Sequence, residues 1–186
     1  MALVSSRNRM SNNIRLLPLA VSLWIGVIGF TTVQAQEKEP ELARVELFGG
    51  YAYLRADAEH GRANLNGWTI SLEGNLNRKL ALVADFDGTY RRGQSSHSAL
   101  FGPKLTARSG RLAPFVHALA GVVREAEEGQ VHYGFGLGLG GGLDYDLNSR
   151  LSLRFAQLDY EYSRVDDLNH NNFRFATGVV IKLGRK

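Results

Sequence analysis

Apolar side chains alternate with glycines along the whole stretch from His132 to Asp146. One face carries Tyr133, Phe135, Leu137, Leu139, Leu143 and Tyr145, and the other carries Gly134, Gly136, Gly138, Gly140, Gly142 and Asp144. Successive Cβ atoms of a strand point to opposite sides, so an alternation of this length predicts one extended strand. Its length, with an aromatic residue near each end, matches a tilted strand that crosses a bilayer. The glycine face suits a crowded interior into which neighbouring side chains reach.

A dinucleotide-binding motif is the competing interpretation of these glycines. Gly136-Leu-Gly138-Leu-Gly-Gly141 satisfies the GxGxxG spacing. That motif binds a pyrophosphate only where a strand turns into a helix N-terminus. Here the alternation continues through the glycines and a turn-forming segment, residues 144–149, follows. The pattern therefore favours a strand over a nucleotide site.

The same alternation recurs along the rest of the chain and predicts eight strands. We place them at residues 45–54, 68–77, 80–90, 101–108, 114–124, 133–145, 151–162 and 173–183. Polar loops are expected at 57–66, 91–98, 125–131 and 166–172, and short turns at 78–79, 109–111 and 147–150. An even number of strands, joined by connections that alternate between long and short, is typical of an up-and-down barrel. The predicted fold class is all-β, an eight-stranded antiparallel up-and-down transmembrane barrel.

Two of the predicted strands contain irregularities that indicate bulges. Pro103 lacks the N–H group that a strand ladder needs, which suggests a local bulge at that position. In residues 151–162 the alternation slips, and Asp159 and Glu161 would face lipid unless one extra residue is accommodated near Ala156-Gln157. We therefore predict a second bulge there.

Residues 1–35 have the composition of a cleavable secretory signal. Arg7, Arg9 and Arg15 precede an apolar run over residues 16–30, and small residues suited to a cleavage site follow at Val33-Gln34-Ala35. An uncleaved anchor and a true start at Met10 stay open as alternatives. Residues 36–44 are then a periplasmic lead-in, and residues 45–186 are the outer-membrane barrel domain.

Most of the excess of basic over acidic residues in the chain lies in this leader. Three of the 22 Lys and Arg lie in residues 1–35, which leaves 19 against 18 Asp and Glu. Such a balance gives no reason to expect nucleic acid as a partner. The chain has no cysteine, so disulfides and thiol chemistry are excluded.

Three segments resemble the eight-stranded outer-membrane β-barrel family, which includes the membrane domain of OmpA, OmpX and opacity-like proteins. They are Phe48-Gly-Gly-Tyr-Ala-Tyr53, Gly140-Gly-Gly-Leu-Asp144 and the last strand, Phe173–Leu183. The resemblance implies location in the bacterial outer membrane, and insertion by the assembly machinery through the last strand. The chain departs from the family where Leu183 replaces a terminal aromatic residue. Family members serve in anchoring, adhesion or lipid modification, so the resemblance does not define an activity.

Charged residues at alternating positions should face the lumen. They are Glu46, Glu73, Asp85, Asp87, Lys104, Arg108, Asp144, Arg154, Arg174 and Lys182. A barrel of eight strands is only wide enough to be filled by side chains, and buried charges must be paired. We therefore expect a structural network that closes the lumen, with Glu73, Asp85, Lys104 and Arg154 near its centre. The alternative is the gate of a narrow pore.

Catalytic, cofactor and metal sites are not expected. Asp85 and Asp87 have a spacing that could serve hydrolysis, but nothing else indicates a cleft. The loop histidines have no ligand-pair spacing; they are His60, His97, His132 and His170. His117 is expected to point inward, between outward Val116, Ala118, Ala120 and Val122. Barrel lipid-A deacylases have a serine two residues after their histidine, and this chain has Leu119 there.

Seven aromatic residues are expected to form a girdle at the membrane interface, near the long-loop ends of their strands. They are Tyr53, Trp68, Tyr90, Phe101, Tyr133, Tyr162 and Phe173. Amphipathic rings favour the headgroup level of a bilayer, whereas packing in a soluble core would not sort them to one end.

The sequence thus predicts a small structural outer-membrane barrel with a closed, charged lumen and short extracellular loops. Its expected partners are outer-membrane lipid, the assembly machinery and, at the loops, an extracellular surface ligand that supports adhesion. The alternatives are a barrel enzyme acting on outer-leaflet lipid, a narrow pore, and a soluble lipocalin-like carrier. An enzyme would need an outward Ser/His/acid set, and a carrier would need an apolar lumen.

Overall fold

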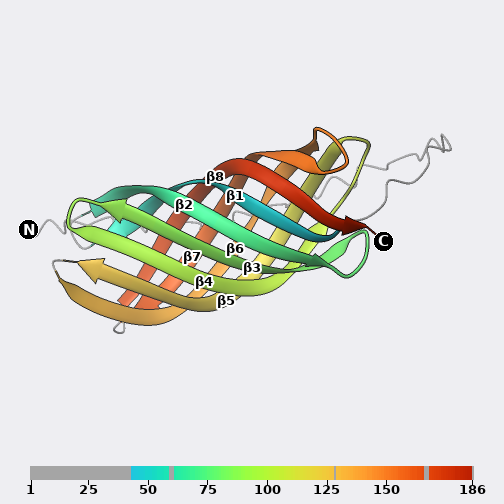
Figure 1. The fold of residues 1–186 in the computed structure, drawn as a ribbon. Helices are drawn as coiled ribbons and strands as arrows, with labels where there is room; N and C mark the ends of the chain where they lie inside the picture. Colours follow the sequence, from blue (N-terminus) through green and yellow to red (C-terminus); the bar gives the residue numbers. More distant parts are fainter. Residues whose placement is uncertain (1–42, 59–60, 128, 166–167, 186) are drawn as a thin grey trace, which may run out of the picture. The chain divides into compact units, whose positions relative to one another are not determined.

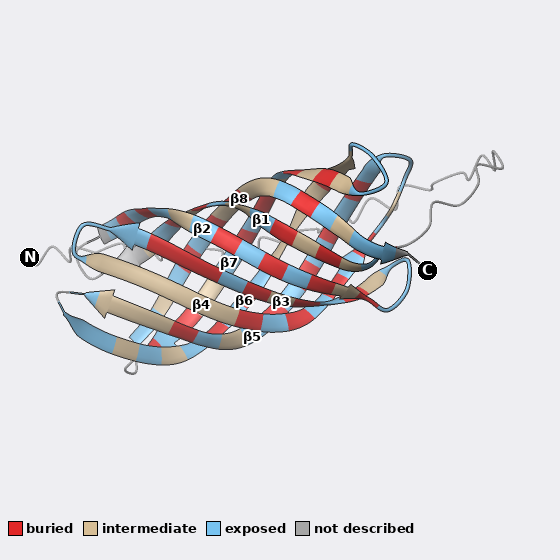
Figure 2. Ribbon diagram, viewed as in Figure 1, coloured by how far each residue is buried: buried red, intermediate tan, exposed pale blue. Residues whose placement is uncertain are grey.

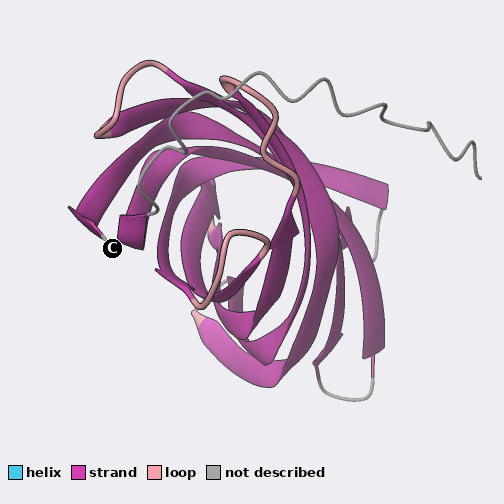
Figure 3. Ribbon diagram, turned by 90° about the vertical axis from the view of Figure 1, so that its right-hand side faces the viewer, coloured by secondary structure: helices cyan, strands magenta, loops and turns pink. Residues whose placement is uncertain are grey.

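The computed structural model describes residues 43–58, 61–127, 129–165 and 168–185, which form a closed antiparallel barrel (Figure 1). Its strands are β1 (Ala43–Ala58), β2 (Gly61–Asn75), β3 (Leu80–Arg91), β4 (Gln94–Thr106), β5 (Leu112–Glu127), β6 (Gln130–Asp146), β7 (Leu151–Val165) and β8 (Leu168–Arg185). Each strand pairs with the next, and β8 pairs with β1 to close the barrel, as Figure 3 shows from one end. The predicted fold class is confirmed. No helix in the described part of the chain is long and apolar enough to cross a membrane.

The predicted leader, residues 1–35, lies outside the described residues. Residues 43 and 44, which we expected in the periplasmic lead-in, already belong to β1. The barrel therefore begins slightly earlier than the alternation of side chains indicates.

Burial alternates along the strands, so one set of side chains fills the lumen and the other covers the outside (Figure 2). In β5, Phe115, His117 and Leu119 are buried, whereas Val116 and Val122 are exposed. The faces predicted for this strand, which is apolar on both sides, are therefore confirmed.

The lumen-facing glycines of β6 make room for side chains of neighbouring strands. A Cβ atom on Gly142 would lie 2.7 Å from the Phe115 ring of β5. A Cβ atom on Gly140 would overlap the Asp159 carboxylate of β7 and lie 2.5 Å from the Leu158 carbonyl oxygen. Both are well inside van der Waals contact, so only glycine fits without displacement of its neighbours. The crowded interior predicted for the glycine face is confirmed.

The bulge predicted in β7 is present. The register of β7 against β6 shifts by one residue between Arg154 and Ala156, which leaves Phe155 as the extra residue. Beyond this bulge Asp159 is buried and Tyr160 is exposed. The extra residue thus moves a carboxylate that would face lipid into the lumen.

The bulge predicted at Pro103 is wrong. In the pairing of β4 with β5, Phe101 lies opposite Ala120 and Lys104 lies opposite His117, which is the same register on both sides of the proline. A proline removes one ladder hydrogen bond, but the loss of one donor does not require an extra residue.

The long polar loops predicted at one end are also wrong, because the hairpins continue as paired strands. Pairing extends to Ala58 and Gly61, to Arg91 and Gln94, to Glu127 and Gln130, and to Val165 and Leu168. Ladder bonds use backbone groups alone, so a polar segment in water can extend a hairpin. Gly93 and Gly129, with φ of 77° and 86°, supply the left-handed backbone that tight turns need.

The three short turns at the opposite end lie where they were predicted. They occupy residues 76–79, 107–111 and 147–150. The connections at the hairpin end are therefore the shorter ones, which reverses the predicted alternation of lengths. We call the end with these three turns the turn end and the other the hairpin end.

We expect Gly140→Ala to destabilise the barrel by about 1–3 kcal/mol, because the new methyl group overpacks the lumen against Asp159. Gly74→Ala is the matched control, since a Cβ atom there meets nothing within 4 Å. Urea denaturation of both variants in vesicles measures the effect. Equal midpoints for the two variants would contradict the packing role of the glycine face.

Candidate functional site

The lumen contains two clusters of ion-paired side chains, and the first is centred on Arg154 of β7. Its guanidinium donates to Asp144 through Nε at 2.7 Å and to Glu73 through Nη2 at 2.9 Å. The guanidinium carbon lies 4.2 Å from the Phe48 ring centroid and 4.4 Å from that of Phe115. Only 1% of Arg154 is exposed. Carboxylates and aromatic rings together replace the water that this cation loses.

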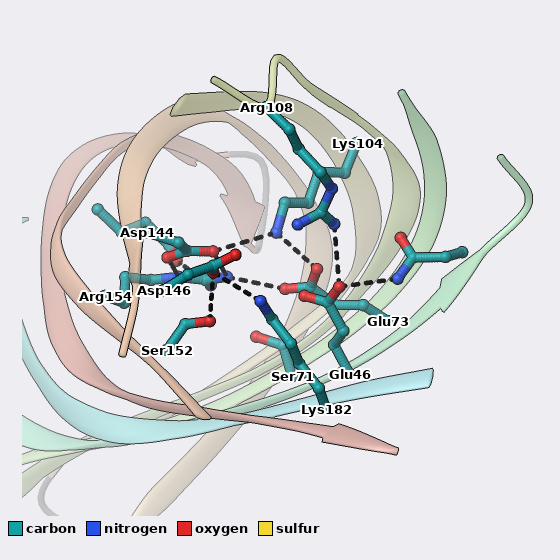
Figure 4. Close-up of polar contacts among 12 residues, drawn as sticks. Glu46, Ser71, Glu73, Lys104, Arg108, Asp144, Asp146, Ser152, Arg154 and Lys182 are labelled. Carbon is teal, nitrogen blue, oxygen red and sulfur yellow. Dashed lines mark hydrogen bonds and ion pairs between the residues drawn. The ribbon is translucent and has the colours of Figure 1, made fainter. Parts of the chain in front are cut away.

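Three further cations complete this Arg154 cluster, which Figure 4 shows. The ion pairs are Lys104–Glu73 at 2.5 Å, Arg108–Glu46 at 2.9 Å and Lys182–Asp146 at 2.6 Å. Lys104 also lies 3.7 Å from Asp144 and so connects the two carboxylates that Arg154 binds. Four acids and four bases therefore balance in this half of the lumen.

Arg174 of β8 is the centre of the second cluster, in which acids outnumber cations. Its guanidinium lies within ion-pair distance of four carboxylates: Asp85 at 2.8 Å, Asp87 at 2.6 Å, Asp159 at 2.8 Å and Glu161 at 2.9 Å. Neutral and titratable donors supply further contacts, since Ser71 donates to Asp85, Ser98 donates to Asp87 and His117 pairs with Asp159. Hydrogen bonds thus stabilise the negative charge that one guanidinium cannot balance.

Gln157 joins the two clusters. Its amide oxygen accepts from Arg154 at 2.8 Å, and its amide nitrogen donates to Asp159 at 2.7 Å. A side-chain amide has one donor end and one acceptor end, and both ends are used here. The two clusters therefore form one continuous network.

All ten charged residues predicted for the lumen lie on its inner face and make at least one ion pair. Glu73, Lys104 and Arg154, three of the four expected at the centre, are in direct contact. The fourth, Asp85, belongs to the Arg174 cluster instead. The alternation along a strand predicts whether a side chain points inward or outward. It does not predict the position of that side chain along the barrel axis relative to residues of distant strands.

Five titratable or bridging residues of the network are absent from the predicted set: Asp146, His117, Gln157, Asp159 and Glu161. The last three follow the bulge of β7, and their inward orientation depends on it. The predicted bulge was itself the signal for them, because it moves the polar side chains after Ala156 to the lumen. His117 was expected inward, but its partner Asp159 is distant in sequence.

The interior leaves little space for water or substrate. One cavity among the described residues has a volume of about 10 Å³, with Ser98, Glu161 and Asn172 in its lining. This is about the space of one water molecule. No group of three or more metal-ligating side chains occurs in the described ranges.

The seven predicted girdle aromatics lie on the outer face, but at two levels. Five lie toward the hairpin end of their strands. Trp68 is at the middle of β2 and Phe101 is nearer the turn end of β4. The prediction that all seven lie toward the long-loop ends of their strands is wrong for these two, because the segments expected as loops extend β2 and β4 beyond the aromatic side chain.

Replacing Arg154 with Met removes the guanidinium and leaves Glu73 and Asp144 buried with fewer partners. We expect a loss of about 3–5 kcal/mol in the free energy of unfolding. The midpoint and slope of urea denaturation in vesicles give this value. Arg62→Met, at an exposed outward position, should change stability by less than about 0.5 kcal/mol. An R154M barrel as stable as this control would show that the network is dispensable.

Several solved structures share the architecture of this barrel. No protein-family model and no curated protein matches the sequence. Neisserial surface protein A (NspA) matches with a TM-score of 0.65 and 17% identity, over 76% of this chain and 98% of that one. Ail, the attachment invasion locus protein of Yersinia pestis, matches at 0.51 and 19%, over 75% and 99%. The N-terminal barrel domain of Pseudomonas aeruginosa OprF matches at 0.50 and 12%, over 75% and 97%. The chain therefore has the fold of the eight-stranded β-barrels of the bacterial outer membrane.

Proposed function

We propose that this chain is a structural barrel of the bacterial outer membrane, exported by residues 1–35 and inserted by the assembly machinery through β8. The observation that carries the proposal is the inversion of a soluble protein's polarity. Ion-paired charges fill the lumen, and large apolar side chains cover the outside. Such an arrangement is favourable only where the outside meets lipid.

Every strand contributes exposed apolar surface. Representative residues are Tyr51, Ile70, Phe86, Phe101, Val116, Leu139, Leu158 and Ile181, each between 41% and 65% exposed. Together they form a band around the closed barrel rather than a patch on one side. A band fits a surrounding bilayer, whereas a patch would fit a single protein partner.

The filled lumen supports a structural role over the alternatives of a pore or a carrier. Arg154 and Arg174 are each 1% exposed and make ion pairs with acids from several strands. Ions would have to break this network to pass. A lipocalin-like carrier needs an apolar cavity, and the lumen of this barrel is polar at its centre.

A lipid-modifying enzyme is the remaining alternative, and the outward side chains argue against it. The nearest candidate is His97, which shares the outer face of β4 with Ser95. His97 Nε2 contacts the Tyr90 hydroxyl at 3.0 Å, and Nδ1 has no hydrogen-bond partner among the described residues. A catalytic histidine needs an acid to orient it. We therefore favour a non-enzymatic role.

The hairpin end is where an extracellular ligand would bind. One structural relative, Ail, is described as an attachment invasion locus protein. We propose a similar use of the polar hairpins here, in contact with a surface partner. Because the connections are tight, such a partner would meet paired strands rather than long loops.

Heat modifiability tests the membrane proposal. After envelope fractionation, the protein should occur in the outer-membrane fraction and change its gel mobility on boiling, because a lipid-embedded barrel resists detergent until heated. A protein found in the soluble periplasm, with equal mobility before and after boiling, would contradict the proposal. The carrier alternative would then become the favoured one.

Conductance separates the structural role from a pore. The purified barrel in a planar bilayer should give no steady current above that of the bare bilayer, because the network fills the lumen. A reproducible single-channel conductance that Arg174→Ala changes would contradict the closed state and support the gate alternative.

A further inference from the structure

The described acids of this barrel lie on one face of its wall, whereas its cations lie on both faces. All ten acids whose side chains the structure describes lie on the lumen face of their strands. They are Glu46, Glu73, Asp85, Asp87, Glu125, Glu127, Asp144, Asp146, Asp159 and Glu161. The described charges on the outer face and on the three turns are all cations. The described part of the exterior is therefore positive.

The turn end shows this sorting most clearly. Its exposed cations are Arg44, at the start of β1, and the turn residues Arg78, Lys79, Arg111 and Arg150. We call this set the turn rim. The three turns contain no Asp or Glu. Like charges held close together repel one another, so a rim of one sign is more favourable with an anionic partner beside it.

Two of these turns have the same design, in which a cation follows an exposed leucine within three residues. Their sequences are Leu76-Asn-Arg-Lys-Leu80 and Leu147-Asn-Ser-Arg-Leu151. In each, the asparagine side chain accepts from two backbone N–H groups two and three residues on, at 2.8–2.9 Å. Leu76 is 54% exposed and Leu147 is 50% exposed. An apolar side chain beside a cation is the composition of a surface at the headgroup level of a bilayer.

The rim cations surround the barrel. The β2–β3 and β6–β7 turns are four strands apart in a closed barrel of eight, and the β4–β5 turn lies between them. A folded protein partner would contact one sector of such a ring. A lipid leaflet contacts all of it.

We propose that the turn rim binds the headgroups of anionic phospholipids in the adjoining leaflet, an inference that rests on the proposed membrane location. The exposed leucines enter the acyl region, and the arginines and lysine beside them bind phosphate groups. This interaction holds the barrel at a fixed height and enriches anionic lipid around its turn end.

Tryptophan reporters beside the rim test the proposal. Leu76→Trp and Leu147→Trp lie at equivalent positions of the two matched turns, each in a Trp68→Phe background. The chain is purified from envelopes, and intact mass verifies removal of the leader, which contains the only other tryptophan, Trp24. Each reporter is placed in vesicles with acyl-brominated phosphatidylglycerol or, separately, acyl-brominated phosphatidylcholine. The ratio of quenching constants gives the local preference for anionic lipid.

We expect a preference of about fivefold for phosphatidylglycerol at both reporters, the order expected from one cation near an anionic surface. Arg111→Gln with Arg150→Gln should abolish the preference at the Leu147→Trp reporter and leave it at the Leu76→Trp reporter. Arg78→Gln with Lys79→Gln should have the converse effect. Arg111→Lys with Arg150→Lys should keep the preference, because it keeps the charge.

A ratio near one at both reporters in the otherwise unsubstituted rim would overturn the proposal and indicate a soluble acidic partner instead. The proposal would also be overturned if the preference stayed unchanged in both Gln double variants. The same holds if one of these double variants removed the preference at both turns. The unmodified chain distinguishes failure of the membrane proposal. Its Trp68 should be quenched by either brominated lipid, and absence of quenching there would refute the membrane location itself.

Discussion

Charge burial is the constraint on which the rest of this structure depends. A buried guanidinium such as that of Arg154 or Arg174 is stable only when carboxylates surround it. Some of those carboxylates come from distant strands, namely Glu73 of β2 and Asp85 and Asp87 of β3, so the barrel must close before these ion pairs can form. Closure in turn directs the other face of every strand outward, and this face is apolar. The positions of the polar lumen and the apolar exterior are therefore both consequences of barrel closure around buried charges.

Alternation along the strands predicted the fold class and the lumen face of all ten charged residues, because both depend on local geometry. It did not predict which charges meet. Asp85 joins Arg174 rather than Glu73, and His117 meets Asp159, because contacts between distant strands depend on register around the barrel. Polarity also misled the assignment of loops, since residues such as Gln94 and Gln130 are polar yet paired. Hydrophobicity marks the extent of lipid contact, whereas the backbone ladder marks the extent of a strand.

The bulge at Phe155 shows how one local irregularity decides the composition of the site. Without the extra residue, Asp159 would lie on the outside and Arg174 would lose a principal partner. Gln157 would no longer connect the two clusters. The same inward sorting of acids leaves cations such as Arg150 on the exterior. Interior chemistry and surface charge are thus two results of one pattern of side-chain orientation.

The glycine face of β6 also limits how this protein can change over evolutionary time. Side chains from neighbouring strands, among them Phe115 and Asp159, occupy the volume above Gly140 and Gly142. A larger residue on β6 would be tolerated only after a neighbour has become smaller, so such positions should vary in pairs. The outward residues of the same strand, such as Phe135 and Leu139, are exposed and free to vary singly. One strand therefore contains both the least and the most substitutable positions of the barrel wall.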